Sequence, residues 1–235
     1  MRRLVLWDID GTLVDSAGAG REAFSDAFEA LFGRPPEGRV EMAGRTDDEI
    51  ALEMLERYAI GDGESHLRGF GEALVQALAA KAEMIAERGR SYPGAKEAIE
   101  RLAAEPGVLQ SLLTGNIEPN AALKLGAVGL LDHLDLEIGG YGSDHRVRSE
   151  LVRIARRKAC QKHGIDFAPD QTVLVGDTPL DVAAGRAAGA RVVAVASSFF
   201  GVDELEAAGA DQVLEDLVDS EALVRAVLSA EPERA

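Results

Sequence analysis

The feature that most constrains the fold of this chain is its alternation of short apolar segments with longer segments of helical periodicity. Six apolar segments predict strands, the last of them an edge strand: Leu4–Trp7, Val108–Leu113, Leu136–Ile138, Thr172–Val175, Val192–Ala196 and Gln212–Leu214. Helical patterns cover Pro93–Ala104, Glu118–Leu125, Val147–His163, Pro179–Ala188 and Ser220–Leu228. Because parallel strands need long crossover connections, usually helices, this order predicts an α/β protein with a parallel sheet covered by helices.

The stretch from about residue 15 to residue 90 breaks this alternation. It has helical periodicity, clearest in Asp47–Tyr58 and Glu64–Arg88, and no convincing strand. The turn-forming sequence Ser91–Gly94 marks the return to the alternating pattern. We therefore expect an α/β core domain of residues 1–14 and 91–235, and an inserted helical cap domain of residues 15–90, called the cap below.

The charge balance excludes several classes of partner. The 235 residues carry 41 Asp and Glu against 25 Lys and Arg, a net charge of −16, which repels nucleic acid and anionic lipid. No apolar run approaches the roughly 18 to 20 residues that span a bilayer. The single cysteine, Cys160, forms no internal disulfide and fits a reducing compartment, so we expect a cytoplasmic protein. We interpret Cys160, on an apolar helix face, as a small core residue.

Carboxylates follow two of the predicted strands directly. Asp8 and Asp10 stand in the sequence Asp-Ile-Asp-Gly-Thr after the first strand, and Asp177 and Asp181 follow the fourth. Alone, either pair could be turn or cap residues. Ligands of open α/β sheets bind beyond the carboxyl ends of the strands, where these side chains would converge and repel one another. A hard divalent cation, Mg²⁺ above all, would resolve that repulsion.

A third strand end carries a sequence suited to binding an anion. Thr114, Gly115 and Asn116 follow the second strand and precede a helix. The Thr114 hydroxyl and the backbone N–H groups of Gly115 and Asn116 could point at one phosphate, helped by the helix dipole. On its own the pattern is equally typical of a helix N-cap.

Taken together, these motifs make the chain resemble the haloacid dehalogenase superfamily, in its phosphoglycolate-phosphatase-like branch. The motifs are D-x-D-G-T at residues 8–12, T-G-N at 114–116 and G-D-T-x-x-D at 176–181, in this order and each at a strand end. The resemblance covers most of the chain. It implies a Rossmann-like core with an inserted helical cap, and a Mg²⁺-dependent hydrolase.

The resemblance also implies a role for each acidic residue. Asp8 would be the nucleophile that forms an aspartyl-phosphate, and Asp10 the general acid and then the general base. Asp8, the backbone carbonyl of Asp10, and Asp177 would bind the metal, with Asp181 supporting the metal site from nearby. Thr114 would bind the phosphoryl oxygens, together with Gly115 and Asn116.

The chain departs from the family pattern at its basic residue, which is usually a lysine. No lysine occurs between Lys124 and Lys158. The sequence resembles a variant of the family in which arginine takes this role, with Arg148 as the first candidate and Arg146 as the second. The alternative is that both are solvated arginines at a helix start.

Related activities are disfavoured by single residues. Dehalogenases lack the acid that this chain has in Asp10, and phosphonatases use a cap lysine, whereas the first lysine here is Lys81. The sugar phosphomutases of the branch carry a cap-linker histidine where this chain has Gly20. In the cap, Arg21 and Arg45 are available for recognition of the substrate's leaving group.

We expect Arg45 to make this contact with the leaving group, which could be a carboxylate. The alternative is an ion pair of Arg45 with Asp47 or Asp48.

The sequence thus predicts a phosphatase acting on a small phosphorylated metabolite, of phosphoglycolate or sugar-phosphate type, through an aspartyl-phosphate. The alternatives are a sugar phosphomutase of the same branch and a non-catalytic binding or regulatory protein with the same fold. We expect a monomer or homodimer with no nucleic-acid or membrane partner.

Overall fold

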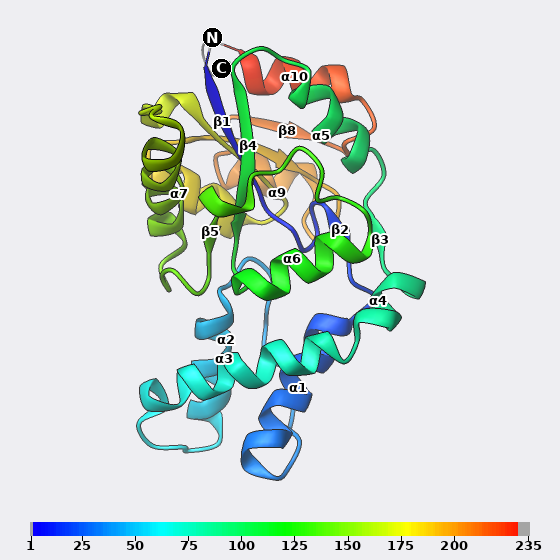
Figure 1. Ribbon diagram of the computed structural model, residues 1–235, viewed down its shortest axis with the longest axis vertical. Helices are drawn as coiled ribbons and strands as arrows, with labels where there is room; N and C mark the ends of the chain where they lie inside the picture. The colour runs from blue at the N-terminus through cyan, green and yellow to red at the C-terminus, as the bar shows by residue number, and fades with distance from the viewer. Residues whose placement is uncertain (1, 230–235) are drawn as a thin grey trace.

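The computed structural model, which describes residues 2–229, has a six-stranded parallel sheet at its centre (Figure 1). The strand order is β5-β4-β1-β6-β7-β8. The strands are β1 (Arg3–Trp7), β4 (Val108–Thr114), β5 (Gly140–Tyr141), β6 (Thr172–Gly176), β7 (Arg191–Val195) and β8 (Gln212–Leu214). The predicted α/β class with a parallel sheet is confirmed, because each neighbouring pair of these strands runs parallel.

Strand β1 lies in the middle of the sheet and is buried along its whole length. Its side chains alternate between two apolar layers, with Val5 and Trp7 in one and Leu4 and Leu6 in the other. A strand covered on both faces needs apolar residues at every position, which is why the first segment reads as a continuous apolar run.

Helices cover both faces of the sheet. The layer of Val5 contains α5 (Ala95–Ala103), α6 (Glu118–Ala127) and α10 (Ser220–Leu228), and the layer of Leu4 contains α7 (Arg148–His163). Near the β7 and β8 edge lie α8 (Pro179–Ala187) and α9 (Val202–Ala207). Every helix predicted in the core occurs within a few residues of its expected range, and α9 was not predicted.

The prediction of a strand over Leu136–Ile138 was wrong. These residues form a 3-10 helix, and the strand that pairs with β4 is Gly140–Tyr141, two residues later. The Asp135 side chain accepts a hydrogen bond from the backbone N–H of Glu137 and so caps the turn. Ile138 is nevertheless fully buried. The apolar pattern therefore predicted burial correctly but predicted the wrong type of element.

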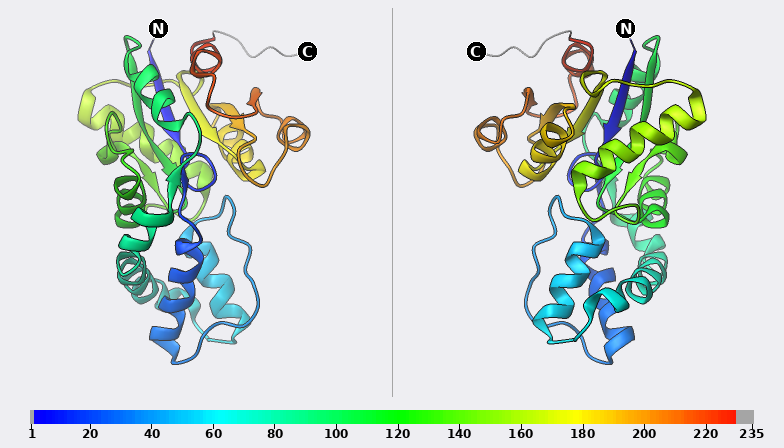
Figure 2. Two further views of the ribbon diagram at one scale, coloured as in Figure 1. Left: turned by 90° about the vertical axis from the view of Figure 1, so that its right-hand side faces the viewer. Right: turned by 90° about the vertical axis from the view of Figure 1, so that its left-hand side faces the viewer.

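Four helices lie between residues 19 and 88 and extend from one end of the sheet (Figures 1 and 2). They are α1 (Ala19–Phe32), α2 (Asp47–Arg57), α3 (Gly63–Ala79) and α4 (Ala82–Arg88), and they share an apolar cluster to which Ile117 and α6 of the core also contribute. The helix predicted over Glu64–Arg88 is broken at residues 80–81.

The chain leaves and re-enters the core through two short strands. β2 (Val14–Asp15) and β3 (Arg90–Ser91) pair antiparallel, with Val14 opposite Ser91 and Asp15 opposite Arg90. These strands coincide with the predicted ends of the cap, although the division into domains stays a prediction. Residues 1 and 230–235 of the predicted core domain lie outside the described residues.

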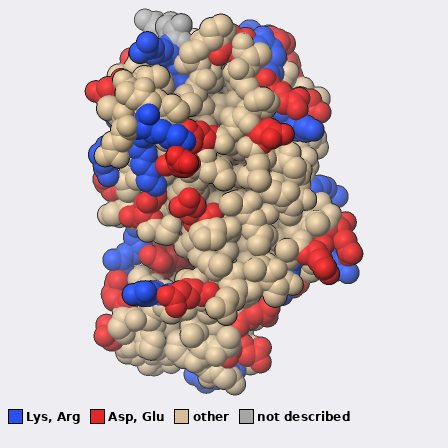
Figure 3. Space-filling view, viewed as in Figure 1, with Lys and Arg blue, Asp and Glu red and all other residues tan. Residues whose placement is uncertain are grey.

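Acidic and basic side chains are mixed on the surface. On the face shown in Figure 3, basic side chains lie beside acidic ones and form no continuous basic stripe. Within residues 2–229, no helix combines the length and the apolar character needed to cross a membrane.

Candidate active site

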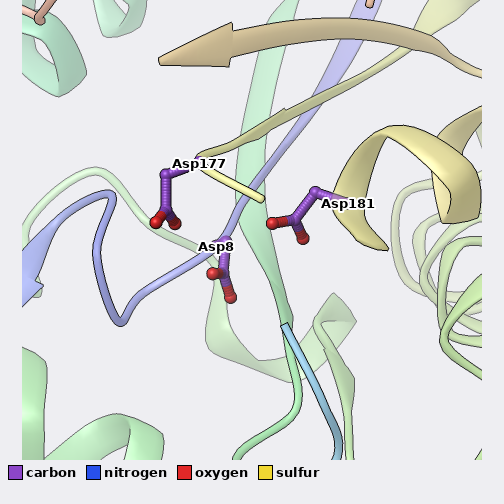
Figure 4. A group of neighbouring side chains, drawn as sticks. All are labelled: Asp8, Asp177 and Asp181. Carbon is purple, nitrogen blue, oxygen red and sulfur yellow. The ribbon is translucent and has the colours of Figure 1, made fainter. Parts of the chain in front are cut away.

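Three carboxylates from two distant segments of the chain meet beyond the carboxyl ends of β1 and β6 (Figure 4). Asp8 follows β1, Asp177 follows β6, and Asp181 lies in the first turn of α8. Each offers an oxygen within 4.8 Å of the others. The two strands are hydrogen-bonded neighbours, which is why motifs separated by about 170 residues come together.

Burial and mutual repulsion make this cluster unfavourable while all its members are charged. Burial raises the pKa of Asp8 well above its ordinary value, and Asp181, Asp177 and Asp10 raise it further while Arg148 lowers it. The pKa of Asp177 is raised to about 7, first by burial and then by Asp181. These residues therefore form a site that favours a bound cation.

Arg148 is the basic residue of the cluster. At the start of α7 and 8 % exposed, it places its Nη2 atom 2.8 Å from Asp8 Oδ1 and 2.6 Å from Asp181 Oδ1. Burial lowers its pKa, but Asp181 and Asp8 raise it more, so the guanidinium stays charged. Arg146, the second candidate, pairs with Glu64 of α3 instead.

Asp181 plays a supporting part. Its Oδ1 accepts from Arg148, and its Oδ2 accepts from the hydroxyl of Thr178 at 2.7 Å and from the Thr178 backbone N–H at 3.1 Å. It is fully buried and does not border the cavity described below, whereas Asp8 and Asp177 do. Asp181 thus holds both the first turn of α8 and the guanidinium of Arg148.

The turn after Asp10 lies directly against Asp177. Thr12 donates a hydrogen bond to Asp177 Oδ1 at 2.9 Å, and the Ser198 hydroxyl donates to Oδ2. Gly11 has a φ of 91°, and a Cβ there would lie 2.2 Å from Asp177 Oδ2. Only glycine allows both this backbone conformation and this close approach.

The loop after β4 presents a hydroxyl to the same site. Thr114 Oγ1 accepts hydrogen bonds from the backbone N–H of Asn116 at 3.2 Å and from its side-chain amide at 2.8 Å. With its acceptor sites used in this way, the Thr114 hydroxyl is left to donate its own proton toward the cavity that it borders.

Asp10 has a partner that the sequence analysis missed. Lys124 of α6 places its Nζ 2.8 Å from Asp10 Oδ1 and 2.6 Å from Oδ2, and is 4 % exposed. A signal existed in the sequence: Lys124 falls on the same helix face as Ala121 and beside Leu125, both fully buried. A lysine at a buried helical position needs an acidic partner, and that requirement could have linked it to Asp10.

A cavity of about 620 Å³ lies between this site and the cap. It is bordered by Asp8, Asp10, Asp177, Thr114, Arg148 and Lys124 on the core side. From the cap come apolar side chains, among them Phe24, Leu74 and Leu78, and the basic residues Arg21 and Arg39.

Helix α2 docks directly on the loop of residues 114–117, which is called the phosphate-binding loop below after its predicted role. The backbone N–H of Asp47 donates to Gly115 O at 2.9 Å, and the Asp47 carboxylate accepts from the backbone N–H of Ile117 at 2.9 Å. A Cβ on Gly115 would lie 2.0 Å from the carbonyl oxygen of Arg45, so glycine lets the two backbones touch.

Arg45 borders the cavity, but its guanidinium is held within the cap. It bonds to Glu53 at 2.5 Å, to Glu41 O at 2.9 Å and to Glu49 O at 3.2 Å. The alternative prediction, an ion pair of Arg45 with Asp47 or Asp48, was wrong, because Arg45 pairs with Glu53. The contact of Arg45 with a substrate stays a prediction that this geometry does not favour.

The interpretation of Cys160 as a core residue was wrong, because it is exposed on α7.

Comparisons with known proteins agree with the motifs. Residues 2–189 match the family of haloacid dehalogenase-like hydrolases. A phosphoglycolate phosphatase of Chromobacterium violaceum is 31 % identical, over 92 % of this chain and 94 % of that protein.

Solved structures share the fold. A hydrolase from Pseudomonas syringae superimposes with a TM-score of 0.71 at 22 % identity, covering 97 % of this chain and all of that one. CbbY from Rhodobacter sphaeroides, solved in complex with phosphate, gives 0.66 at 22 % identity, covering 93 % of this chain and 96 % of that one. At this identity the likeness concerns the fold alone. From the family match and the curated relative, the chain belongs to the haloacid dehalogenase-like hydrolases.

Proposed function

We propose that this protein is a Mg²⁺-dependent phosphatase that hydrolyses a small phosphomonoester through an aspartyl-phosphate on Asp8. One observation carries the proposal. A buried nucleophilic carboxylate, a carboxylate able to transfer protons, a hydroxyl donor and a guanidinium all border one cavity beneath the cap helices: Asp8, Asp10, Thr114 and Arg148.

Asp8 is suited to attack phosphorus. Its Oδ1 faces Arg148, and within residues 2–229 no hydrogen bond reaches its Oδ2, which leaves that oxygen free to form the new bond. Arg148 and Thr114 stabilise the negative charge on the transferring phosphoryl oxygens.

Asp10 transfers the protons of both steps. As Asp8 Oδ2 bonds to phosphorus, the bond between phosphorus and the leaving oxygen breaks and that oxygen takes the proton of Asp10. Asp10 then takes a proton from water while the water oxygen bonds to phosphorus, which releases phosphate and restores Asp8.

The acidic cluster fits a divalent cation. Its three carboxylates and one guanidinium leave two negative charges, which one such ion balances. Asp8, Asp177 and the backbone carbonyl of Asp10 would hold it, with Asp181 in support. When bound, the ion shields Asp8 from the negative phosphate and polarises the phosphoryl group.

The substrate side of the cavity suits a small ester with an anionic or polar leaving group. Arg21 borders the cavity and uses one guanidinium nitrogen on Val40 O at 3.1 Å, so its other N–H groups can meet a carboxylate. Together with the name of the relative from C. violaceum, this supports phosphoglycolate as the first substrate to test. The cytoplasmic location and the monomeric or homodimeric state stay predictions.

The phosphomutase alternative has less support. The space beside Gly20, where phosphomutases of this branch carry a histidine, is occupied by Lys124, whose Nζ lies 3.5 Å from the position of a Cβ on Gly20. A mutase would interconvert sugar phosphates and release little phosphate. Phosphate release from a panel of phosphomonoesters with Mg²⁺ separates phosphatase, mutase and non-catalytic protein.

The decisive variant is Asp8→Asn. We expect phosphate release to fall by several orders of magnitude while the protein stays folded, because the amide is a poor nucleophile of nearly the same shape. Near-normal turnover of this variant would refute the assignment of Asp8.

A further inference from the structure

Lys124 is a buried lysine for which the roles assigned above leave no function. It lies on α6, and its ammonium group reaches the cavity between core and cap. A buried ammonium is costly unless its hydrogen-bond donors are matched. The groups that accept hydrogen bonds from Lys124 therefore indicate its role.

Three acceptors match the three N–H bonds of the ammonium group. They are Asp10 Oδ1 at 2.8 Å, Asp10 Oδ2 at 2.6 Å and Asn116 Oδ1 at 2.7 Å. All three belong to the region where chemistry is proposed, and no acidic residue outside that region pairs with Lys124 in the described chain.

Lys124 also fixes the orientation of Asn116. Because an ammonium can only donate, the amide oxygen of Asn116 must face it, and the amide nitrogen must face the other way. That nitrogen donates to Asp10 Oδ2 at 2.7 Å and to Thr114 Oγ1 at 2.8 Å. One lysine thus orients the amide that links Asp10 to Thr114.

Asp10 depends on these two partners. Its side chain is 45 % exposed, and among residues 2–229 only Lys124 and Asn116 make hydrogen bonds to its carboxylate. Without them the side chain could rotate away from the reacting oxygen, and proton transfer requires hydrogen-bond contact.

We propose that Lys124 is a positioning residue that holds Asp10 in place for both proton transfers. This inference rests on the proposed phosphatase function. The N–H bonds of Lys124 are taken up by Asp10 and Asn116, so it acts on the reaction through Asp10, directly and by way of Asn116.

The test compares two phosphate esters in Lys124→Met. p-Nitrophenyl phosphate has a leaving group that departs without a proton at neutral pH, whereas glycerol 2-phosphate needs one. We expect kcat for glycerol 2-phosphate to fall about 100- to 1000-fold with little change in KM, the range of a lost general acid or base. With p-nitrophenyl phosphate we expect a burst of nitrophenolate equal to the enzyme, followed by slow turnover, because only the second step needs Asp10.

Controls separate positioning from stability. Asp10→Asn should show the same burst. Lys81→Met removes a largely buried lysine that pairs with Glu22 and Asp26 away from the cavity, and should change neither the burst nor the ratio of the two rates. Lys124→Gln, which keeps the length but not the charge, should repeat the result of Lys124→Met.

Three outcomes count against specific claims. If wild-type enzyme releases phosphate from neither ester nor from phosphoglycolate, the proposed function fails. If wild type is active and Lys124→Met loses rate equally on both esters without a burst, only the positioning role fails. Failure of both Lys124 variants to fold would assign the lysine to stability and also overturn that role.

Discussion

At the scale of single residues, the site contains buried carboxylates whose negative charges destabilise the folded protein unless a cation neutralises them. Asp177 illustrates this, because its pKa of about 7 shows that its charged form is disfavoured by burial and by Asp181. Hydrogen bonds from Thr12 and Ser198 offset only part of that cost. A bound cation would therefore stabilise the charged form of Asp177.

Asp177→Asn should change stability in opposite directions with and without metal. At pH 8 without Mg²⁺ the variant should be more stable than wild type, because an amide has no charge to bury and can still bond with the hydroxyls of Thr12 and Ser198. With saturating Mg²⁺ the wild type should gain about 2 to 4 kcal/mol by mass action, and the variant little. Thermal unfolding across a Mg²⁺ titration measures both effects. Equal Mg²⁺ responses of the two proteins would remove Asp177 from the metal site.

At the scale of elements, helix α2 is the contact between cap and phosphate-binding loop. Its first residue, Asp47, is buried, and its carboxylate accepts the backbone N–H of Ile117. Burial raises the pKa of Asp47 to about 7, although Lys124 and the bond from Ile117 lower it. Because an unfolded Asp47 ionises near its ordinary value of 3.8, its contribution to stability falls as pH rises from there to about 7 and is constant above.

Asp47→Asn should remove this dependence. The amide oxygen can still accept from Ile117, and no charge is buried. The free energy of unfolding of the variant relative to wild type should rise between pH 5 and pH 7 and level off above. The full effect of three pKa units is on the order of 4 kcal/mol. Urea unfolding at a series of pH values measures it, and a difference that stays flat over this range would show that Asp47 is charged in the folded protein.

At the scale of the whole molecule, the sequence predicted the positions of residues at the ends of strands. It did not predict contacts that depend on how helices and loops pack on the sheet. The sequence predicted that Asp8, Thr114 and Asp177 would border one site, because parallel strands bring their carboxyl ends together, and all three border the cavity. Lys124 was missed because it lies inside a helix and not at a strand end, so the order of the strands does not place its side chain beside Asp10.

Two other misses have different causes. The guanidinium of Arg45 turns toward Glu53, a choice made by the packing of cap segments and not by local pattern. The apolar run at 136–138 marked a buried turn, because periodicity in three residues does not distinguish a strand from a 3-10 turn.

Backbone contact at Gly115 is one of the contacts that join cap and core, beside the packing of α3 and α4 on α6, and its role is testable. In Gly115→Ala the new methyl group would overlap the carbonyl oxygen of Arg45, a backbone atom that cannot rotate away. We expect the loop of residues 115–117 and α2 to separate, with faster hydrogen exchange at the Ile117 amide and at least a tenfold loss of kcat/KM, since water then enters the cavity. The matched control is Gly71→Ala on α3, where nothing lies within 4 Å of the new Cβ and a helical alanine should stabilise by about 0.5 to 1 kcal/mol. Unchanged exchange at Ile117 together with normal activity in Gly115→Ala would show that this contact does not determine how the cap closes.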